Sequence, residues 1–182
     1  MKKQQTLKMV FIALFCALSI VLVYFIHFPI FPSAPFLEYD PADVMIFICT
    51  FLFGPLAGCI CTIVVSFLQW FLVSPQSGWY GFVMHIIATG SFVLVAGLIY
   101  KFKHTLSGSI IALICGTITM ALVMMPANLI ITPIFSGMPV SAVWDMMPVI
   151  VGFNAIKAGG NAILSFILYK SIGRPIEKMV KE

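Results

Sequence analysis

Apolar residues fill most of this chain and form long runs that short polar or proline-rich segments separate. A helix that crosses a membrane needs about 20 mostly apolar residues. Most of the runs are close to that length, and those that are shorter lie beside a proline-containing break. The pattern predicts six membrane-spanning helices, over residues 9–26, 44–53, 56–73, 81–100, 109–131 and 149–169.

One part of the pattern has two interpretations. The run from Val44 to Val73 is interrupted by Gly54 and Pro55. Proline has no backbone N–H and disfavours helix at the residue before it. The run is therefore either one kinked span or two spans, the first of them short, that a tight turn joins.

The distribution of charge favours two spans there and six in total. With six spans, both termini and the loop 101–108 lie on the same side of the membrane, and that side holds every basic residue except Lys157. The loops on the other side, at 27–43, 74–80 and 133–148, contain acids but no Lys or Arg. Cytoplasmic loops are the ones enriched in Lys and Arg. We therefore expect both termini in the cytoplasm.

Composition agrees with this interpretation. Of 182 residues, 62% are hydrophobic and 9% are charged, whereas a soluble domain has about 45–50% apolar and about 25% charged residues. We expect an all-α integral membrane protein, with residues 1–182 forming a single membrane domain and the external loops structured. The net charge of +4 marks topology and does not indicate nucleic-acid binding. No Walker A or other catalytic motif is present, so an ATP-driven role requires a separate ATPase.

Lys157 is the one basic residue that the topology does not explain. It lies in the external half of the last span, where an ionisable side chain is costly and suggests a functional site. The alternative is a lysine that extends its charged end to the membrane surface. Asn154 and Asn161 lie three residues before and four residues after it, on roughly the same helix face. This polar stripe favours an inward-facing binding surface.

Other polar candidates keep two interpretations each. Asn128, which follows Pro126, either bonds a neighbouring helix or binds a ligand. Glu38, Asp40 and Asp43 form an acidic cluster that could serve acid–base chemistry. Asp40 or Asp43 could instead cap the second span, and the cap is the interpretation we favour for Asp43.

Aromatic residues gather near the predicted outer boundary. Trp70, Trp79, Tyr80 and Trp144 are typical of an interfacial belt, and the alternative is that one of them stacks on a flat ligand. His85 is expected to be a hydrogen-bonded residue of the bundle, because no second His or Cys lies at metal-ligand spacing. No metal site is expected.

Several motifs together resemble a known family. They are the proline-rich loop that ends in Pro35-Phe36-Leu37-Glu38-Tyr39-Asp40-Pro41-Ala42-Asp43-Val44, the Phe53-Gly54-Pro55-Leu56-Ala57-Gly58 turn, and Asn128 and Pro133 followed by Phe153-Asn154-Ala155-Ile156-Lys157. In combination they resemble the substrate-binding S components of energy-coupling factor (ECF) vitamin transporters, and most closely the riboflavin-binding members. The resemblance runs over roughly residues 7–172.

The resemblance implies a high-affinity capture subunit for riboflavin, or for FMN, in the plasma membrane of a bacterium. It implies a binding subunit without enzymatic activity, with riboflavin as its substrate and no resident cofactor. The implied partners are a membrane scaffold subunit, two cytoplasmic ATPases and membrane lipid. The third and fourth spans depart from the family pattern, so a different vitamin or small metabolite is the alternative. A membrane-embedded enzyme that uses Glu38, Asp40 or His85 is a second, less favoured one.

The resemblance also implies site residues. The vitamin is expected under the first external loop, held by groups that match polar positions of the family and by loop and aromatic residues, namely Asn128, Asn154, Lys157, Leu37, Glu38, Tyr39, Asp40, Trp79 and Phe153. The family's first helix carries an AxxxA motif that contacts the scaffold. Ala13 and Ala17 match it, although small residues at this spacing also serve internal packing.

Overall fold

The computed structural model describes residues 2–173, 175–176 and 179, and most of these are helical. The helices in chain order are α1 (Lys2–Phe25), α2 (Ala42–Phe53), α3 (Pro55–Leu72), α4 (Gly78–Phe102), α5 (Leu106–Ser136), α6 (Val140–Asp145) and α7 (Met147–Leu168). A 3-10 turn, η1 (Pro75–Ser77), precedes α4, and a π-helical turn, η2 (Tyr169–Gly173), follows α7. The basic residues Arg174, Lys178 and Lys181 of the expected cytoplasmic tail lie outside the described residues.

Within the described residues, five helices are long and apolar enough to cross a membrane, namely α1, α3, α4, α5 and α7. This agrees with the expected all-α membrane architecture. The short apolar helix α2 has 12 residues, or about 18 Å at 1.5 Å per residue, against a hydrocarbon core of about 30 Å. Ile46, Phe47 and Ile48 of α2 are buried. The helix is therefore surrounded by protein, not by lipid.

The chain reverses between α2 and α3 at Gly54. Its φ of 89° is a conformation that side-chain-bearing residues rarely adopt, and Pro55 begins α3, where a missing N–H costs nothing. A Cβ on Gly58 of α3 would collide with the side chain of Thr50 in α2, so the two helices touch soon after the turn. The structure thus has two packed helices here, not one kinked helix.

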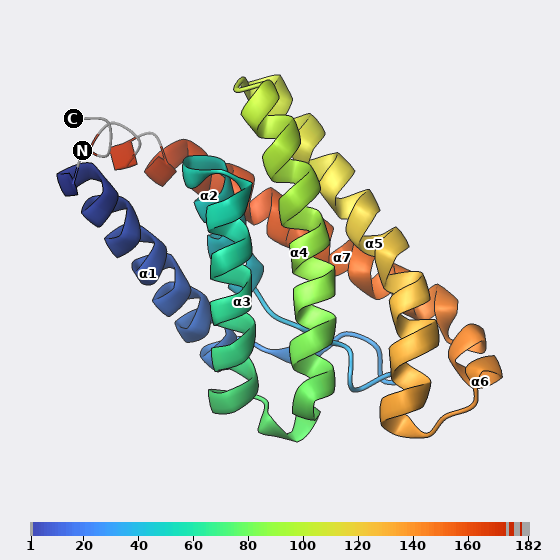
Figure 1. The fold of residues 1–182 in the computed structure, drawn as a ribbon. Helices are drawn as coiled ribbons and strands as arrows, with labels where there is room; N and C mark the ends of the chain where they lie inside the picture. The colour runs from blue at the N-terminus through green and yellow to red at the C-terminus, as the bar shows by residue number, and fades with distance from the viewer. Residues whose placement is uncertain (1, 174, 177–178, 180–182) are drawn as a thin grey trace.

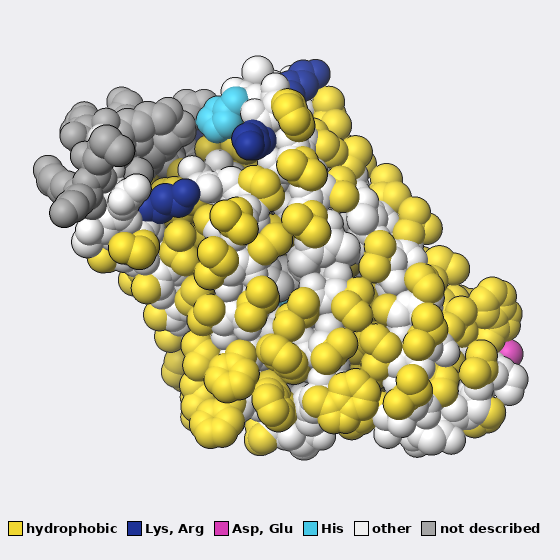
Figure 2. Space-filling model, viewed as in Figure 1, with side chains coloured by type: hydrophobic (Ala, Val, Ile, Leu, Met, Phe, Trp, Pro, Cys, Tyr) yellow, Lys and Arg dark blue, Asp and Glu magenta, His cyan; other side chains and the backbone are white. Residues whose placement is uncertain are grey.

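The bundle has two chemically different ends (Figure 1). The start of α1, the α4–α5 turn and η2 lie toward its upper end, where Lys and His side chains gather on the surface (Figure 2). The long loop after α1, η1 and the α5–α6 turn lie at the lower end. Between the two ends the visible surface is largely apolar, as a surface that faces lipid must be.

The segment between α1 and α2 folds back on the lower end of the bundle. Two short strands, β1 (Phe28–Pro29) and β2 (Glu38–Tyr39), pair antiparallel with Phe28 opposite Tyr39. Ala34 and Leu37 of the intervening loop are buried against α6 and the start of α7. This pairing and this packing fix residues 36–40 over the gap between α3, α4, α5 and α7.

Candidate ligand-binding site

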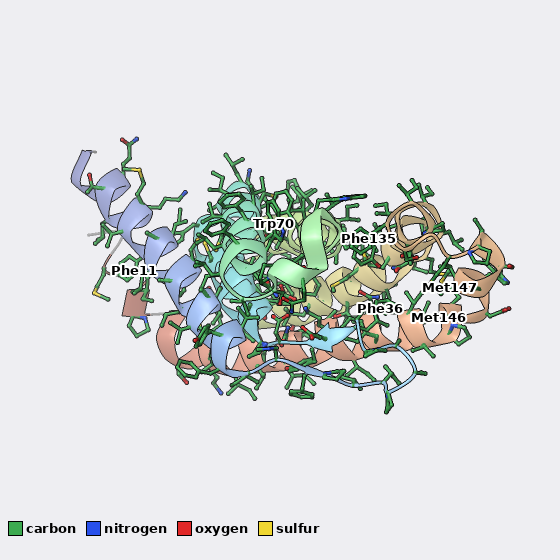
Figure 3. The ribbon with its side chains drawn as sticks, turned by 90° about the horizontal axis from the view of Figure 1, so that it is seen from below. Phe11, Phe36, Trp70, Phe135, Met146 and Met147 are labelled. Carbon is green, nitrogen blue, oxygen red and sulfur yellow. The ribbon has the colours of Figure 1, made fainter. Side chains whose placement is uncertain are left out.

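A cavity lies beneath this loop at the lower end of the bundle. Its inner part has a volume of about 140 Å³ and is bounded by the loop and by α3, α4, α5 and α7. An adjoining hollow of about 300 Å³ lies between the loop, α4 and the end of α5, and Phe36, Glu38 and Tyr80 border both. Seen from below, Phe36, Trp70 and Phe135 lie around this end, with nitrogen and oxygen atoms gathered between the helices (Figure 3). Taken together, the two spaces reach the size range of small-molecule sites.

A buried ion pair joins the loop to α7 at the base of this cavity. Lys157 Nζ donates to Asp40 Oδ2 at 2.7 Å, and both residues line the inner cavity. Asp40 is 2% exposed and Lys157 is 8% exposed. The other carboxylate oxygen of Asp40 accepts a hydrogen bond from the backbone N–H of Ala42 at 3.0 Å. The carboxylate of Asp40 therefore bonds both the start of α2 and the ammonium group of Lys157.

A second buried acid, Asp43, lies one helical turn further into the bundle and pairs with a histidine. Asp43 is fully buried, and its Oδ1 lies 3.0 Å from His85 Nε2 and 2.8 Å from the Thr89 hydroxyl that donates to it. A buried carboxylate without such partners would be strongly destabilising. Asp43 thus fixes the ring of His85, which lines the inner cavity.

Hydrogen bonds on both sides hold the ring of His85. The hydroxyl of Ser66 donates to the Thr62 carbonyl at 2.7 Å, and Ser66 Oγ lies 3.1 Å from His85 Nδ1. The carboxylate of Asp43 can only accept, so His85 Nε2 donates to it. The base of the cavity therefore holds two buried carboxylates, one bonded to Lys157 and the other to His85.

Asn161 connects the two pairs to the loop. Its Nδ2 donates to the backbone carbonyl of Asp40 at 2.9 Å and lies 3.5 Å from Asp43 Oδ2. Its Oδ1 accepts from the Tyr39 hydroxyl at 2.9 Å. Burial, with the carboxylate of Asp40 nearby, raises the pKa of the Tyr39 phenol above its usual value. The phenol therefore stays protonated and donates to Asn161 at neutral pH.

The polar stripe expected on the last span is present on α7. Asn154, Lys157 and Asn161 are all buried, and the first two line the inner cavity. Asn154 Nδ2 donates to the Ile150 carbonyl at 2.8 Å. Lys157 is paired with Asp40 inside the protein and does not extend to the membrane surface. Helical spacing alone placed these three groups on one face.

Asn128 reaches the same cavity from α5. Its Nδ2 donates to the Met124 carbonyl at 2.8 Å, and its Oδ1 accepts from Thr132 at 3.0 Å and from the Tyr80 hydroxyl at 3.4 Å. The last of these bonds crosses from α5 to α4. Asn128 therefore makes the expected bond between helices, and it also lies on the cavity wall.

The expectation that Asp43 caps α2 is wrong. The residue before α2 is Pro41, which makes no side-chain cap, and Asp43 lies inside the first turn. Its carboxylate instead accepts hydrogen bonds from His85 and Thr89. The capping function falls to Asp40, whose Oδ1 accepts from the N–H of Ala42. An acid in the first turn still interacts favourably with the helix dipole.

The remaining candidate residues divide into two groups. Leu37, Glu38 and Phe153 line the inner cavity with the polar residues already described. Tyr39 does not line it and holds the loop through Asn161. Trp79 is 46% exposed, packs edge-on against Phe135 and does not line either space.

The sequence did not single out Gln69 as a site residue. Among the residues that the structure describes, its Oε1 is the only buried side-chain nitrogen or oxygen atom without a hydrogen-bond partner. Gln69 lines the inner cavity, and its Nε2 lies 3.4 Å from Asp40 Oδ2. Such an atom is costly unless something donates to it. Ser66 lies three residues earlier on the same face of α3. Two polar residues on one face of an apolar span were the sequence feature that could have identified Gln69 as a site residue.

Trp70 and Tyr80 line the cavity, unlike Trp79 and Trp144. The three tryptophans that the sequence analysis assigned to an interfacial belt therefore differ in location. Trp70 lies in the cavity wall, whereas Trp144 on α6 is 59% exposed. The cavity offers aromatic and methionine walls, a lysine with donors to spare and an unsatisfied acceptor. This combination suits a flat, partly apolar ligand with polar edges.

Comparisons with known proteins agree on one family. The family model described as "ECF transporter, substrate-specific component" matches residues 7–169. The chain is 30% identical to the riboflavin transporter RibU of Staphylococcus aureus (strain TCH60), over 97% of this chain and 95% of that protein. It is 28% identical to the riboflavin transporter FmnP of Bacillus subtilis (strain 168), over 91% and 84%.

A solved structure shares the fold. It is the S component of a bacterial ECF transporter, which superposes with a TM-score of 0.81 at 31% identity and covers 93% of this chain and 97% of that one.

Proposed function

The chain belongs to the family of substrate-specific S components of ECF transporters, and we propose that the substrate it captures is riboflavin. As a member of this family it is a substrate-binding subunit, not an enzyme, and a multi-pass protein of the bacterial plasma membrane. Two riboflavin transporters are its relatives over most of its length. The structural observation that carries the proposal is the cavity in which loop residues, Asn154 and Lys157 converge.

The lining of the cavity matches the two halves of riboflavin, a flat ring system with carbonyl edges and a chain of hydroxyl groups. Trp70 and Tyr80 supply aromatic surface for the ring. The ammonium of Lys157 has three donors, of which Asp40 takes one, so two are left for carbonyl or hydroxyl oxygens of the ligand. Gln69 Oε1 accepts a hydrogen bond from the ligand and is thereby satisfied.

Charge favours riboflavin over FMN. Lys157, the cation at the base of the cavity, already has Asp40 as its carboxylate partner, and His85 faces the carboxylate of Asp43. Glu38, which also lines the cavity, adds a further negative charge. Among the described lining residues no positive charge is therefore left over to balance a phosphate. The phosphate of FMN would be desolvated without compensation.

Riboflavin titration tests the proposal. We expect riboflavin fluorescence to be quenched on binding to the purified protein, with a Kd in the nanomolar range, about −12 kcal/mol, and with FMN at least tenfold weaker. Protein purified from a flavin-containing host should be yellow, and mass spectrometry of the extracted ligand should give the mass of riboflavin. A colourless protein that does not titrate with flavin, or a different co-purified vitamin, would reject the substrate assignment.

The transmembrane arrangement that we propose has six crossings, with α2 as a short crossing enclosed by protein and both termini in the cytoplasm. The support is the charge of the two ends. The described lysines Lys101, Lys103 and Lys170 lie at the end that carries the α4–α5 turn and η2, and the acids Glu38 and Asp145 lie at the other end. Positive residues mark the cytoplasmic side, which places the cavity near the external face.

Import requires an energy source that a binding subunit lacks, so we propose docking on an ECF scaffold subunit that carries two cytoplasmic ATPases. Ala13 and Ala17 lie on the exposed face of α1, where small residues let another helix approach closely. We expect Ala13→Leu/Ala17→Leu to abolish co-purification with the scaffold and to leave riboflavin affinity unchanged. Retained co-purification would exclude this face as the contact, and lost riboflavin binding would show that the variant is misfolded.

A further inference from the structure

An apolar groove runs along the outside of the bundle between α5 and α7. Its volume is about 390 Å³, and almost all of its lining is hydrophobic. The groove exists partly because position 159 is glycine. A Cβ there would meet only Thr117 Cγ2, at 4.0 Å, so nothing in the described chain fills this space. Its wall is completed by residues such as Ile114, Ile118 and Ile163.

The groove lies next to a polar cavity at the end of the bundle that carries the α4–α5 turn. This cavity has a volume of about 170 Å³, and Phe166 borders both spaces. Its polar lining includes His104, Thr105 and Lys170, with the hydroxyls of Tyr100 and Tyr169 3.1 Å apart. One end of the combined site is therefore polar and the rest is apolar.

The polar end carries lysine charge. Lys170 lines it beside the ring of His104, and Lys101 lies exposed close by on α4. Thr105 also lines it and caps the N-terminus of α5, where its side chain accepts from the N–H of Gly108. Among the described residues, the acids lie at the other end of the molecule or in its interior. Figure 2 shows Lys and His side chains on the surface at this end of the molecule.

The dimensions suit one hydrocarbon chain. From Phe166 to Gly159 the groove follows seven residues of α7, or about 10 Å at 1.5 Å per residue. Half of a hydrocarbon core is about 15 Å. The groove therefore starts at the basic membrane surface and ends within the same leaflet.

We propose that this composite site binds a phospholipid with an anionic headgroup, whose phosphate lies between His104 and Lys170 and one of whose acyl chains lies in the groove between α5 and α7. Its position at the basic end places the lipid in the cytoplasmic leaflet, where anionic lipids attract basic segments. The site is separate from the riboflavin cavity, which lies at the other end of the bundle.

Native mass spectrometry tests the proposal with two lipids of the same acyl chains, phosphatidylglycerol and phosphatidylcholine. We expect the protein to retain phosphatidylglycerol at least fivefold better. Lys170→Gln should reduce that retention at least fivefold, and the matched variant Lys101→Gln, which removes the same charge from the same end outside the cavity, should not. Gly159→Leu, which fills the groove, should reduce retention of both lipids. Riboflavin titration of each variant checks that it is folded.

Three results would overturn the lipid site. Equal retention of the two lipids would remove the role of the headgroup charge. Equal loss in Lys170→Gln and Lys101→Gln would show attraction to the whole basic surface without a site. Competition by soluble glycerophosphoglycerol as effective as that of the intact lipid would show that the groove contributes nothing.

Discussion

Replacing Lys157 with methionine is expected to weaken riboflavin binding at least tenfold, which corresponds to about 1.4 kcal/mol. Methionine keeps the length and apolar stem of the side chain but removes the donors that remain after Asp40 takes one. Isothermal titration or fluorescence quenching gives the change in Kd. The same variant leaves the carboxylate of Asp40, 2% exposed, without its counter-ion. Loss of one partner of a buried pair costs about 3–5 kcal/mol of stability, so the melting temperature should also fall.

A double variant separates these two effects. Asp40→Asn/Lys157→Met removes both charges, and the asparagine oxygen can still accept from the N–H of Ala42. We expect the melting temperature to recover most of the loss while the affinity for riboflavin stays low. If the double variant instead binds as well as Asp40→Asn alone, Lys157 serves only as a counter-ion and does not contact the ligand.

Replacing Asp43 with alanine is expected to be the most destabilising single change in the cavity region. The side chain is fully buried in the first turn of α2 and accepts hydrogen bonds from His85 and Thr89. Its removal leaves His85 Nε2 and the Thr89 hydroxyl without the acceptor that both now share. We expect a loss of about 3–5 kcal/mol, measured as a fall in melting temperature in detergent.

Asp145→Ala is the matched control. Asp145 is an exposed acid at the end of α6, and surface substitutions of this kind change stability by about 0.5 kcal/mol or less. Asp43→Asn/His85→Gln, which removes both ionisable groups and keeps polar groups of similar size, should recover part of the loss. If Asp43→Ala and Asp145→Ala melt at the same temperature, the Asp43–His85 pair does not stabilise the fold.

Much of the helical framework and part of the site could be predicted from local pattern. Asn154, Lys157 and Asn161 were found because residues three and four apart on a helix share a face, and because a charge in an apolar span calls for a partner. The partner itself could not be found in this way. Asp40 lies 117 residues from Lys157 in the chain, and no local rule connects an external loop to the last helix.

Competition between partners explains the wrong assignment of Asp43. Sequence spacing placed it beside the start of a helix, where an acid commonly caps the backbone. In the fold, His85 and Thr89 of α4 lie against it, and Asp40 satisfies the helix start instead. Gln69 was overlooked for a similar reason. Gln69 is notable because its Oε1 has no hydrogen-bond donor, and this can be recognised only once the positions of all neighbouring residues are known.

The sequence by itself determined that this protein is built of apolar membrane helices and that the chain breaks at Gly54 and Pro55. It could do so because the bilayer requires each crossing to be long and apolar and to satisfy its own backbone. Only the tertiary structure decided which side chains meet. The loop folds back over α3, α4, α5 and α7, and that contact creates both the cavity and the pairing of its charges. Such pairings depend on how helices pack against each other, which the period of a single helix does not encode.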